Sequence, residues 1–421
     1  MLDNFFVYHR TGKCLFSASY NGRPLGFEFM QGLKAASSTL FSFTHRNKEA
    51  ENARREAANT NSEPGQPGAA KSDAGHDENI VTELVLGDLY FQFYDMGTFL
   101  LIAQGARGVP PSSLRMAIDA VRDTIVFYIG KFDSVSQDTT IFESIADIVR
   151  DVLKRQNELA LFVNGVPCIP LNSRATAVLD RLLSSLEENH NVYGSALVIG
   201  DAVMHRRSDV HQTKMLLQHI AARPMNNSVI RCIPVYVDGR AQNMVLLRIN
   251  NMVLCVFTHI VSAFSELVPY IENFEVSLED EVYHLPKDNM PILLRNYTGP
   301  TLAVITFSIH VSLTSYSGLD TLAFLYYDSQ KGKVVAPAFR LENNQNETMA
   351  KAFHWFFATA QEVHGKNGVA QLTMAGGEHI FHHIERNGVF LSALYSTVVA
   401  DNVATLTDEI FDNVRRSLNE L

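Results

Sequence analysis

Two stretches of the chain share one pattern of apolar runs separated by a polar turn. The segments "FFVYHRTGKCLFSA", at residues 5–18, and "FLYYDSQKGKVVAP", at residues 324–337, each break off at a short glycine-containing segment and then resume. Two apolar runs joined in this way predict a β-hairpin. The similarity indicates that one structural unit occurs more than once in the chain.

The residues after the first hairpin predict the rest of the first unit. Apolar residues recur at helical spacing over residues 25–43, which predicts a helix there. Three strand-like runs follow at residues 82–86, 89–94 and 98–103. Pro111 is typical of a first helical turn and begins the next helix, and a further helix is expected at about residues 140–155. The order is two strands, a helix, three strands and helices.

A middle segment repeats this order. Two strands flank Gly200 and Asp201, and Asp209 with Gln212 has the spacing of a capping box at the start of a helix. Strands are then expected at residues 230–237, 244–249 and 253–257, followed by a helix at residues 261–273.

The last segment repeats the order again. Its helix carries an apolar stripe and is expected to stop at Gly365. The stripe consists of Met349, Phe353, Phe356, Ala360 and Val363. Strands are expected at residues 369–375, 379–385 and 390–396, followed by a helix at residues 406–418.

The repeated order predicts an α/β (α+β) chain of three tandem units, each a five-stranded antiparallel sheet flanked by helices. The expected domains are residues 1–160, 190–290 and 300–421. Residues 47–79 contain almost no large apolar side chain and are rich in Gly, Pro, Ala and charge in their second half. They are expected to form a disordered insertion in the first unit.

Composition narrows the classes of function. The 421 residues are 46% hydrophobic and carry a net charge of −10, which argues against a general nucleic-acid binder. The four cysteines are scattered and predict neither a disulfide framework nor a zinc site. No secretory signal and no apolar run of the roughly 20 residues of a membrane helix is evident, so a cytoplasmic chain is expected.

Two clusters of side chains are candidate sites. His379, His382 and His383 resemble metal ligands, but a strand would place His382 on the face opposite the other two. Structural histidines are therefore expected, with no metal and no cofactor. Arg206 and Arg207 suit either contact with an anionic membrane or the solvated end of a hairpin. No P-loop and no nucleophile elbow occurs, so no catalytic residue is assigned.

The order of elements and several local segments resemble a known family. Starting almost on its first strand, the chain is similar to the triple-longin subunits of Rab-activating heterodimers. "FLYYDSQKGKVVAPAF" and "GTFLLIAQ" resemble the first Hermansky–Pudlak syndrome branch, and "RCIPVYVDGRAQNMVLLRINNMVLCVFTH" resembles the Fuzzy branch. The choice among these branches and the Mon-one branch stays open.

The resemblance implies one subunit of a guanine-nucleotide exchange factor for a Rab-family GTPase. It implies a second longin-domain subunit of the Ccz-one, Inturned or fourth Hermansky–Pudlak type, and peripheral association with endosomal or lysosomal membranes. The alternative is a non-catalytic longin adaptor or tether, as in planar-polarity or ciliary transport. Within the helix at residues 25–43, Phe27, Phe29 and Phe41 are candidates for the partner or GTPase interface. Phe27 and Phe41 lie off the apolar stripe, and packing in the core is the competing interpretation.

Overall fold

A computed structural model describes most of the elements that the sequence predicts. The residues it describes are 2–9, 11–20, 32, 35, 82–130, 140–155, 163, 165–168, 173–188, 191–200, 202–225, 230–249, 252–259, 264–284, 321–335, 344–367 and 370–417. The predicted insertion at residues 47–79 lies outside this part of the chain. So does the predicted helix at residues 25–43, apart from Gly32 and Ala35.

The chain divides into two compact units. Unit 1 comprises Met1–Arg122 and Lys131–Ala146, and unit 2 comprises Asp123–Gly130 and Asp147–Leu421. Unit 1 contains one sheet and unit 2 contains two.

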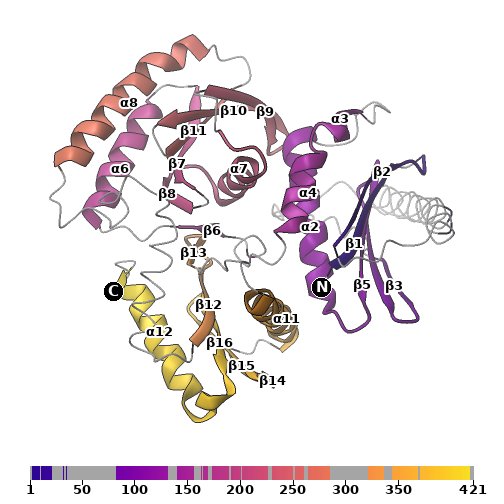
Figure 1. Cartoon of the computed structure of the whole chain (residues 1–421). Coiled ribbons are helices and arrows are strands. Elements are labelled where there is room, and N and C mark those ends of the chain that lie inside the picture. The colour runs from indigo at the N-terminus through magenta and orange to yellow at the C-terminus, as the bar shows by residue number, and fades with distance from the viewer. Residues whose placement is uncertain are drawn as a thin grey trace, which may run out of the picture. The chain divides into compact units, whose positions relative to one another are not determined.

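The first sheet has five antiparallel strands in the order β2-β1-β5-β4-β3 (Figure 1). They are β1 (Leu2–His9), β2 (Cys14–Ser19), β3 (Thr82–Leu86), β4 (Leu89–Asp95) and β5 (Phe99–Ala106). Alternate aromatic and aliphatic residues form an apolar cluster on one face, which includes Phe6, Tyr8 and Phe91. The helix α2 (Pro111–Ile129) follows, and all five residues of its predicted stripe are buried: Leu114, Ile118, Val121, Ile125 and Ile129.

The second sheet has the order β8-β7-β11-β10-β9. Its strands are β7 (Val192–Ile199), β8 (Ala202–Arg206), β9 (Ile230–Val237), β10 (Arg240–Ile249) and β11 (Met252–His259). The helix α7 (Val210–Ala222) packs on one face, and α6 (Ser173–Leu186) and α8 (Phe264–His284) pack on the other (Figure 1). Asp209 and Gln212 form the predicted capping box at the start of α7.

The third sheet has six strands in the order β14-β15-β16-β12-β13-β6. They are β6 (Val166–Pro167), β12 (Thr321–Asp328), β13 (Lys333–Val335), β14 (Gln371–Gly376), β15 (His379–Arg386) and β16 (Val389–Ser396). The helix α11 (Asn344–Asn367) packs on one face through Phe353, Phe356 and Ala360, as its stripe predicts. The opposite face carries α12 (Val403–Ser417), preceded by the 3-10 helix η2 (Thr397–Asn402).

The three sheets share one strand order. Numbering the five main strands of each sheet along the chain gives the spatial order 2-1-5-4-3 every time. In the second and third sheets a helix lies between the second and third strands in the chain, and another follows the fifth. The protein is therefore a mixed α/β chain with three sheets of mostly antiparallel strands.

The structure corrects several predicted elements. The helix expected at residues 140–155 is two helices, α3 (Thr140–Glu143) and α4 (Ala146–Lys154). The Ile145 amide bonds the carbonyl of Phe142, three residues back, and the Ile145 side chain is buried, so the helix is interrupted there. The helix α11 continues two residues past the predicted stop at Gly365. The third sheet is six-stranded because the parallel strand β6 joins it.

The helix α6 was not predicted, and it begins before the second expected domain at residue 190. It packs against α8 in the core of the second sheet. Within the described residues no helix is both long enough and apolar enough to cross a membrane.

Candidate functional site

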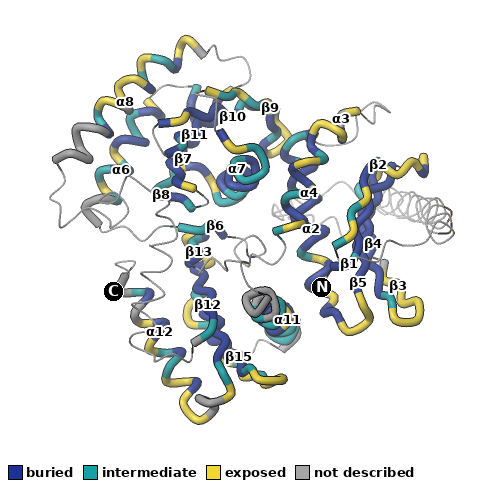
Figure 2. Tube along the Cα trace, in the orientation of Figure 1, coloured by how far each residue is buried: buried dark blue, intermediate teal, exposed yellow. Residues whose placement is uncertain are grey.

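The outermost strand of the first sheet is the candidate interaction site. The strand β3 pairs with β4 alone among the described strands, so its other edge carries backbone groups without a neighbouring strand there. Three consecutive aliphatic side chains are exposed on it: Leu84 by 38%, Val85 by 51% and Leu86 by 47% (Figure 2). Because neighbouring strand residues point to opposite faces, both faces of this edge are apolar.

The chemistry of β3 suits strand-to-strand association. Natural edge strands are usually protected by lysine, proline or a bulge. The strand β3 has the sequence TELVL, whose one charged side chain is Glu83, and it pairs with β4 without a shift in register. The side-chain Nε2 of Gln92 donates to Glu83 Oε1 at 3.4 Å, which draws that charge toward the neighbouring strand. We call residues 82–86 the open edge.

The open edge is not among the site residues predicted from the sequence. The feature that could have indicated it is the run Leu84-Val85-Leu86. A strand with one solvated face alternates polar and apolar residues, and this run has no polar residue. The position of β3 at the outside of the sheet is what makes this run exposed, and that position depends on the strand order.

Arg206 lies at the end of β8 and is engaged inside unit 2. Its guanidinium Nη1 donates to the carbonyl of Ser208 at 2.7 Å, and its Nη2 donates to the carbonyl of Lys331 at 2.7 Å. The second bond links the second sheet to the turn between β12 and β13 of the third. Membrane contact by Arg206 stays a prediction. In the structure this side chain also connects the two sheets of unit 2.

Arg207 takes part in an acidic cluster. Its Nε donates to Glu187 Oε2 at 2.7 Å, and its Nη1 donates to Asp180 Oδ1 at 2.9 Å. His205 Nε2 lies 3.1 Å from the same Asp180 oxygen. The hydrogen bonds from His205 and then from Arg207 lower the pKa of Asp180. Membrane contact by Arg207 also stays a prediction, and its charge is balanced by two carboxylates.

The histidines of β15 alternate across the sheet as the strand pattern predicts. His382 faces Thr373, with its Nδ1 2.7 Å from the hydroxyl, and His383 Nδ1 lies 2.8 Å from Ser392 Oγ on the other face. Burial lowers the pKa of His383 to about 4, with His364 and His382 adding to the effect. Within the described residues no three His, Cys, Asp or Glu side chains are grouped to hold a metal ion. These contacts give His382 and His383 structural roles.

A buried polar contact joins α2 and α7, and it is not among the contacts predicted from the sequence. The hydroxyl of Tyr128, in the last turn of α2, lies 2.8 Å from Nδ1 of His219 on α7. Burial, followed by Arg223 and Arg231, lowers the pKa of His219 to about 4, and burial raises the pKa of Tyr128. Both groups are therefore neutral at pH 7, and their hydrogen bond holds the end of α2 on α7. A single sequence gives no signal for such a contact, because its partners are 91 residues apart.

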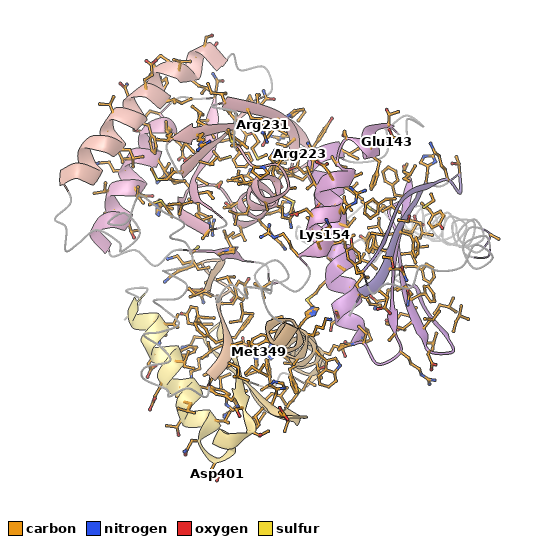
Figure 3. The ribbon with its side chains drawn as sticks, viewed as in Figure 1. Glu143, Lys154, Arg223, Arg231, Met349 and Asp401 are labelled. Carbon is orange, nitrogen blue, oxygen red and sulfur yellow. The ribbon has the colours of Figure 1, made fainter. Side chains whose placement is uncertain are left out.

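The end of α7 is held by arginines. Arg223 donates to both carboxylate oxygens of Asp147, at 2.6 and 2.7 Å, and this hydrogen-bonded pair lowers the pKa of Asp147. Arg231 donates from β9 to the carbonyl of Arg223 at 2.8 Å (Figure 3). A cation bound to the last carbonyls of a helix satisfies groups that have no partner within the helix. Arg231 therefore caps the end of α7, and the pair between Arg223 and Asp147 ties that end to the first turn of α4.

The predicted interface candidates Phe27, Phe29 and Phe41 lie outside the described residues. Their role stays a prediction, and so does the choice between an interface and a core position for Phe27 and Phe41. Comparison of the chain with known protein families gives no match, and comparison with curated proteins gives none.

Proposed function

We propose that this chain is one subunit of a heterodimeric guanine-nucleotide exchange factor for a Rab-family GTPase. It would act in endosomal, lysosomal or lysosome-related organelle trafficking, from the cytoplasm, in peripheral contact with the membrane. The proposal takes the three sheets as longin-like units. The observation that carries it is the strand order 2-1-5-4-3, found in all three sheets.

The open edge supports a partner subunit for the first sheet. Fully burying a valine or leucine side chain stabilises an association by about 1.5–3 kcal/mol, so Leu84, Val85 and Leu86 together offer a substantial apolar contact. A strand of the partner added at this edge would also satisfy the outer backbone groups of β3. A second longin-domain subunit presents strands of this kind.

The mechanism proposed for exchange needs no acid, base or nucleophile from this chain. An exchange factor accelerates nucleotide release by binding most tightly to the GTPase state whose switch segments have let go of magnesium and nucleotide. The free energy of that differential binding sets the size of the acceleration. A surface composed of two subunits is sufficient, and the helix predicted from the sequence at residues 25–43 is the proposed contact element on this side.

The test uses the full chain with the partner that co-purifies with it. We expect the purified complex to accelerate release of a fluorescent GDP analogue from at least one member of a panel of Rab GTPases. The chain alone is the control. If a stable complex forms but accelerates release from no GTPase in the panel, the exchange-factor proposal is wrong and the adaptor or tether becomes the better interpretation.

Substitution of Phe27 and Phe41 tests the proposed contact element. If either ring lies at the interface, Phe→Ala should weaken association by about 2 kcal/mol, roughly 30-fold, at an unchanged melting temperature. If the ring lies in the core, the same change should instead cost about 3–5 kcal/mol of folding stability. Melting and GDP release measured on the same preparations separate the two outcomes.

A further inference from the structure

A short segment between α4 and α6 pairs with the third sheet. We call Val163 and residues 165–168 the strap. The strap's β6 runs parallel to β13, with Val166 opposite Lys333 and Pro167 opposite Val334. The amide of Val166 donates to the carbonyl of Gly332 at 2.8 Å, and the amide of Cys168 donates to that of Val334 at 3.0 Å. The strap therefore covers the edge of the third sheet formed by β13, the second of its five main strands.

The same segment reaches the second sheet. Cys168 forms a parallel bridge with Val203 on β8, the second-strand edge of that sheet. Val166 is 0% exposed and packs in the core between the second sheet and α7. Val163 packs instead in the core between the third sheet and α11. The strap thus contributes one valine to each of two cores and a backbone contact to each of two sheets.

A second contact joins the same two sheets. The turn between β12 and β13 lies against the start of α7, so close that a Cβ atom at Gly332 would overlap the side chain of Val210. Gly332 has a φ of +60°, which favours glycine in any case. Beside it, the carbonyl of Lys331 accepts the 2.7 Å hydrogen bond from Arg206. We call Arg206, Val210, Lys331 and Gly332 the clasp.

We propose that the strap and the clasp join the second and third sheets into a single conformational body, with the β8 and β13 edges closed to strands of other chains. The pairing then runs from β9 through β8, across the strap, and from β13 to β14. Among the described strands, the outer edges of this body are β9 and β14. This inference concerns the isolated chain and does not depend on the proposed function.

The glycines of the third sheet supply a matched pair for the test. Gly332 and Gly377 both lie in hairpin turns, with φ of +60° and +61°. A Cβ at Gly332 would meet Val210 of the second sheet, whereas a Cβ at Gly377 would meet nothing within 4 Å. Gly332→Ala and Gly377→Ala therefore impose the same backbone strain, and the first alone also breaks the clasp.

The experiment is hydrogen–deuterium exchange of the full-length chain, followed by mass spectrometry. We expect Gly332→Ala to speed exchange about tenfold in the strap, in β8 and in the first turn of α7, because contacts across the two sheets protect all three. Gly377→Ala should affect β14 and β15 and leave β8 and the strap as in the wild type. If Gly332→Ala changes exchange only around its own hairpin, the proposal is wrong.

A second pair of variants keeps the test valid if Gly332→Ala fails to fold. Arg206→Ala removes the hydrogen bond to the third sheet, and Arg207→Ala removes the ion pairs with Asp180 and Glu187 beside the second sheet. We expect Arg206→Ala alone to speed exchange in β13, by about threefold to tenfold. Equal protection of β13 in the two variants would also overturn the proposal.

Discussion

The β3 edge of the first sheet and the β13 edge of the third sheet differ in what covers them. The outer strand β3 of the first sheet exposes three aliphatic residues in a row and pairs on one side among the described strands. The strand β13 would end the third sheet, but the strap covers it, and its Val334 and Val335 are buried. The two edges differ in position as well as in cover: β3 is the third strand of its sheet and β13 is the second, and within the described residues an added strand covers the β13 edge and none covers the β3 edge.

The difference indicates where a partner would bind. An apolar strand edge left bare promotes association between chains, whereas a covered edge does not. The strap closes an edge of the third sheet within the chain itself. The open edge has no such segment among the described residues, so it is the better candidate for a surface that another protein completes.

The largest expected effect concerns acid, and it should fall on unit 2. The folded pKa of His383 is about 4, below the ordinary 6.5, because the ring is buried. The unfolded state therefore takes up protons first as pH falls, so stability present above pH 6.5 is lost toward pH 4. The shift corresponds to about 3 kcal/mol for this histidine, and His219 adds a loss of the same sign.

The acid effect is measured by urea unfolding at a series of pH values. His383→Gln should reduce the loss of stability between pH 6.5 and pH 4, because glutamine does not titrate. The wild type, measured over the same series of pH values, is the control. An unaltered pH dependence in His383→Gln would contradict the buried neutral ring.

The next effect compares a strap valine with an open-edge valine. Val166→Ala removes two methyl groups from a closed core and should lower the free energy of unfolding by about 2–3 kcal/mol. Val85→Ala removes the same groups from an exposed position and should change it by less than about 0.5 kcal/mol. Urea unfolding of both variants measures the two losses of stability. Similar losses would contradict the contrast between the covered edge and the open edge.

Binding at the open edge should show an effect of about 2 kcal/mol. Val85→Lys places a charge on the apolar edge and should weaken association with the proposed partner subunit roughly 30-fold, while the melting temperature stays within a few degrees. Val276→Lys makes the same change at a valine on α8 that is 61% exposed, and it serves as the control. Unchanged affinity in Val85→Lys would place the partner elsewhere.

The smallest effect concerns a local cap. Asp209→Ala removes the acceptor of the amide of Gln212, a hydrogen bond of 2.7 Å at the start of α7. Loss of such a cap costs about 1 kcal/mol, so the melting temperature should fall by a few degrees. Asp209→Asn retains an acceptor and should lie close to the wild type. If Asp209→Ala melts at the same temperature as the wild type, the clasp and not the cap fixes this end of α7.

The sequence alone determined the local elements. Spacings of three and four residues predict the apolar stripes of α2 and α11 and the capping box at Asp209. Residues at these spacings share one face of a helix, whatever the helix packs against. The opposite faces of His382 and His383 follow from the two-residue period of a strand. The repeated order of strands and helices can likewise be predicted from the sequence.

Tertiary structure alone decided the contacts between distant segments. The two-residue strand β6 has no sequence signal of its own, because it is a strand only through its pairing with β13. The partners of Arg206 and Tyr128 lie 125 and 91 residues away, so no local pattern could name them. The exposure of Leu84, Val85 and Leu86 depends on β3 being outermost in its sheet. Local periodicity reports the face a residue occupies, and the packing of the whole chain decides what covers that face.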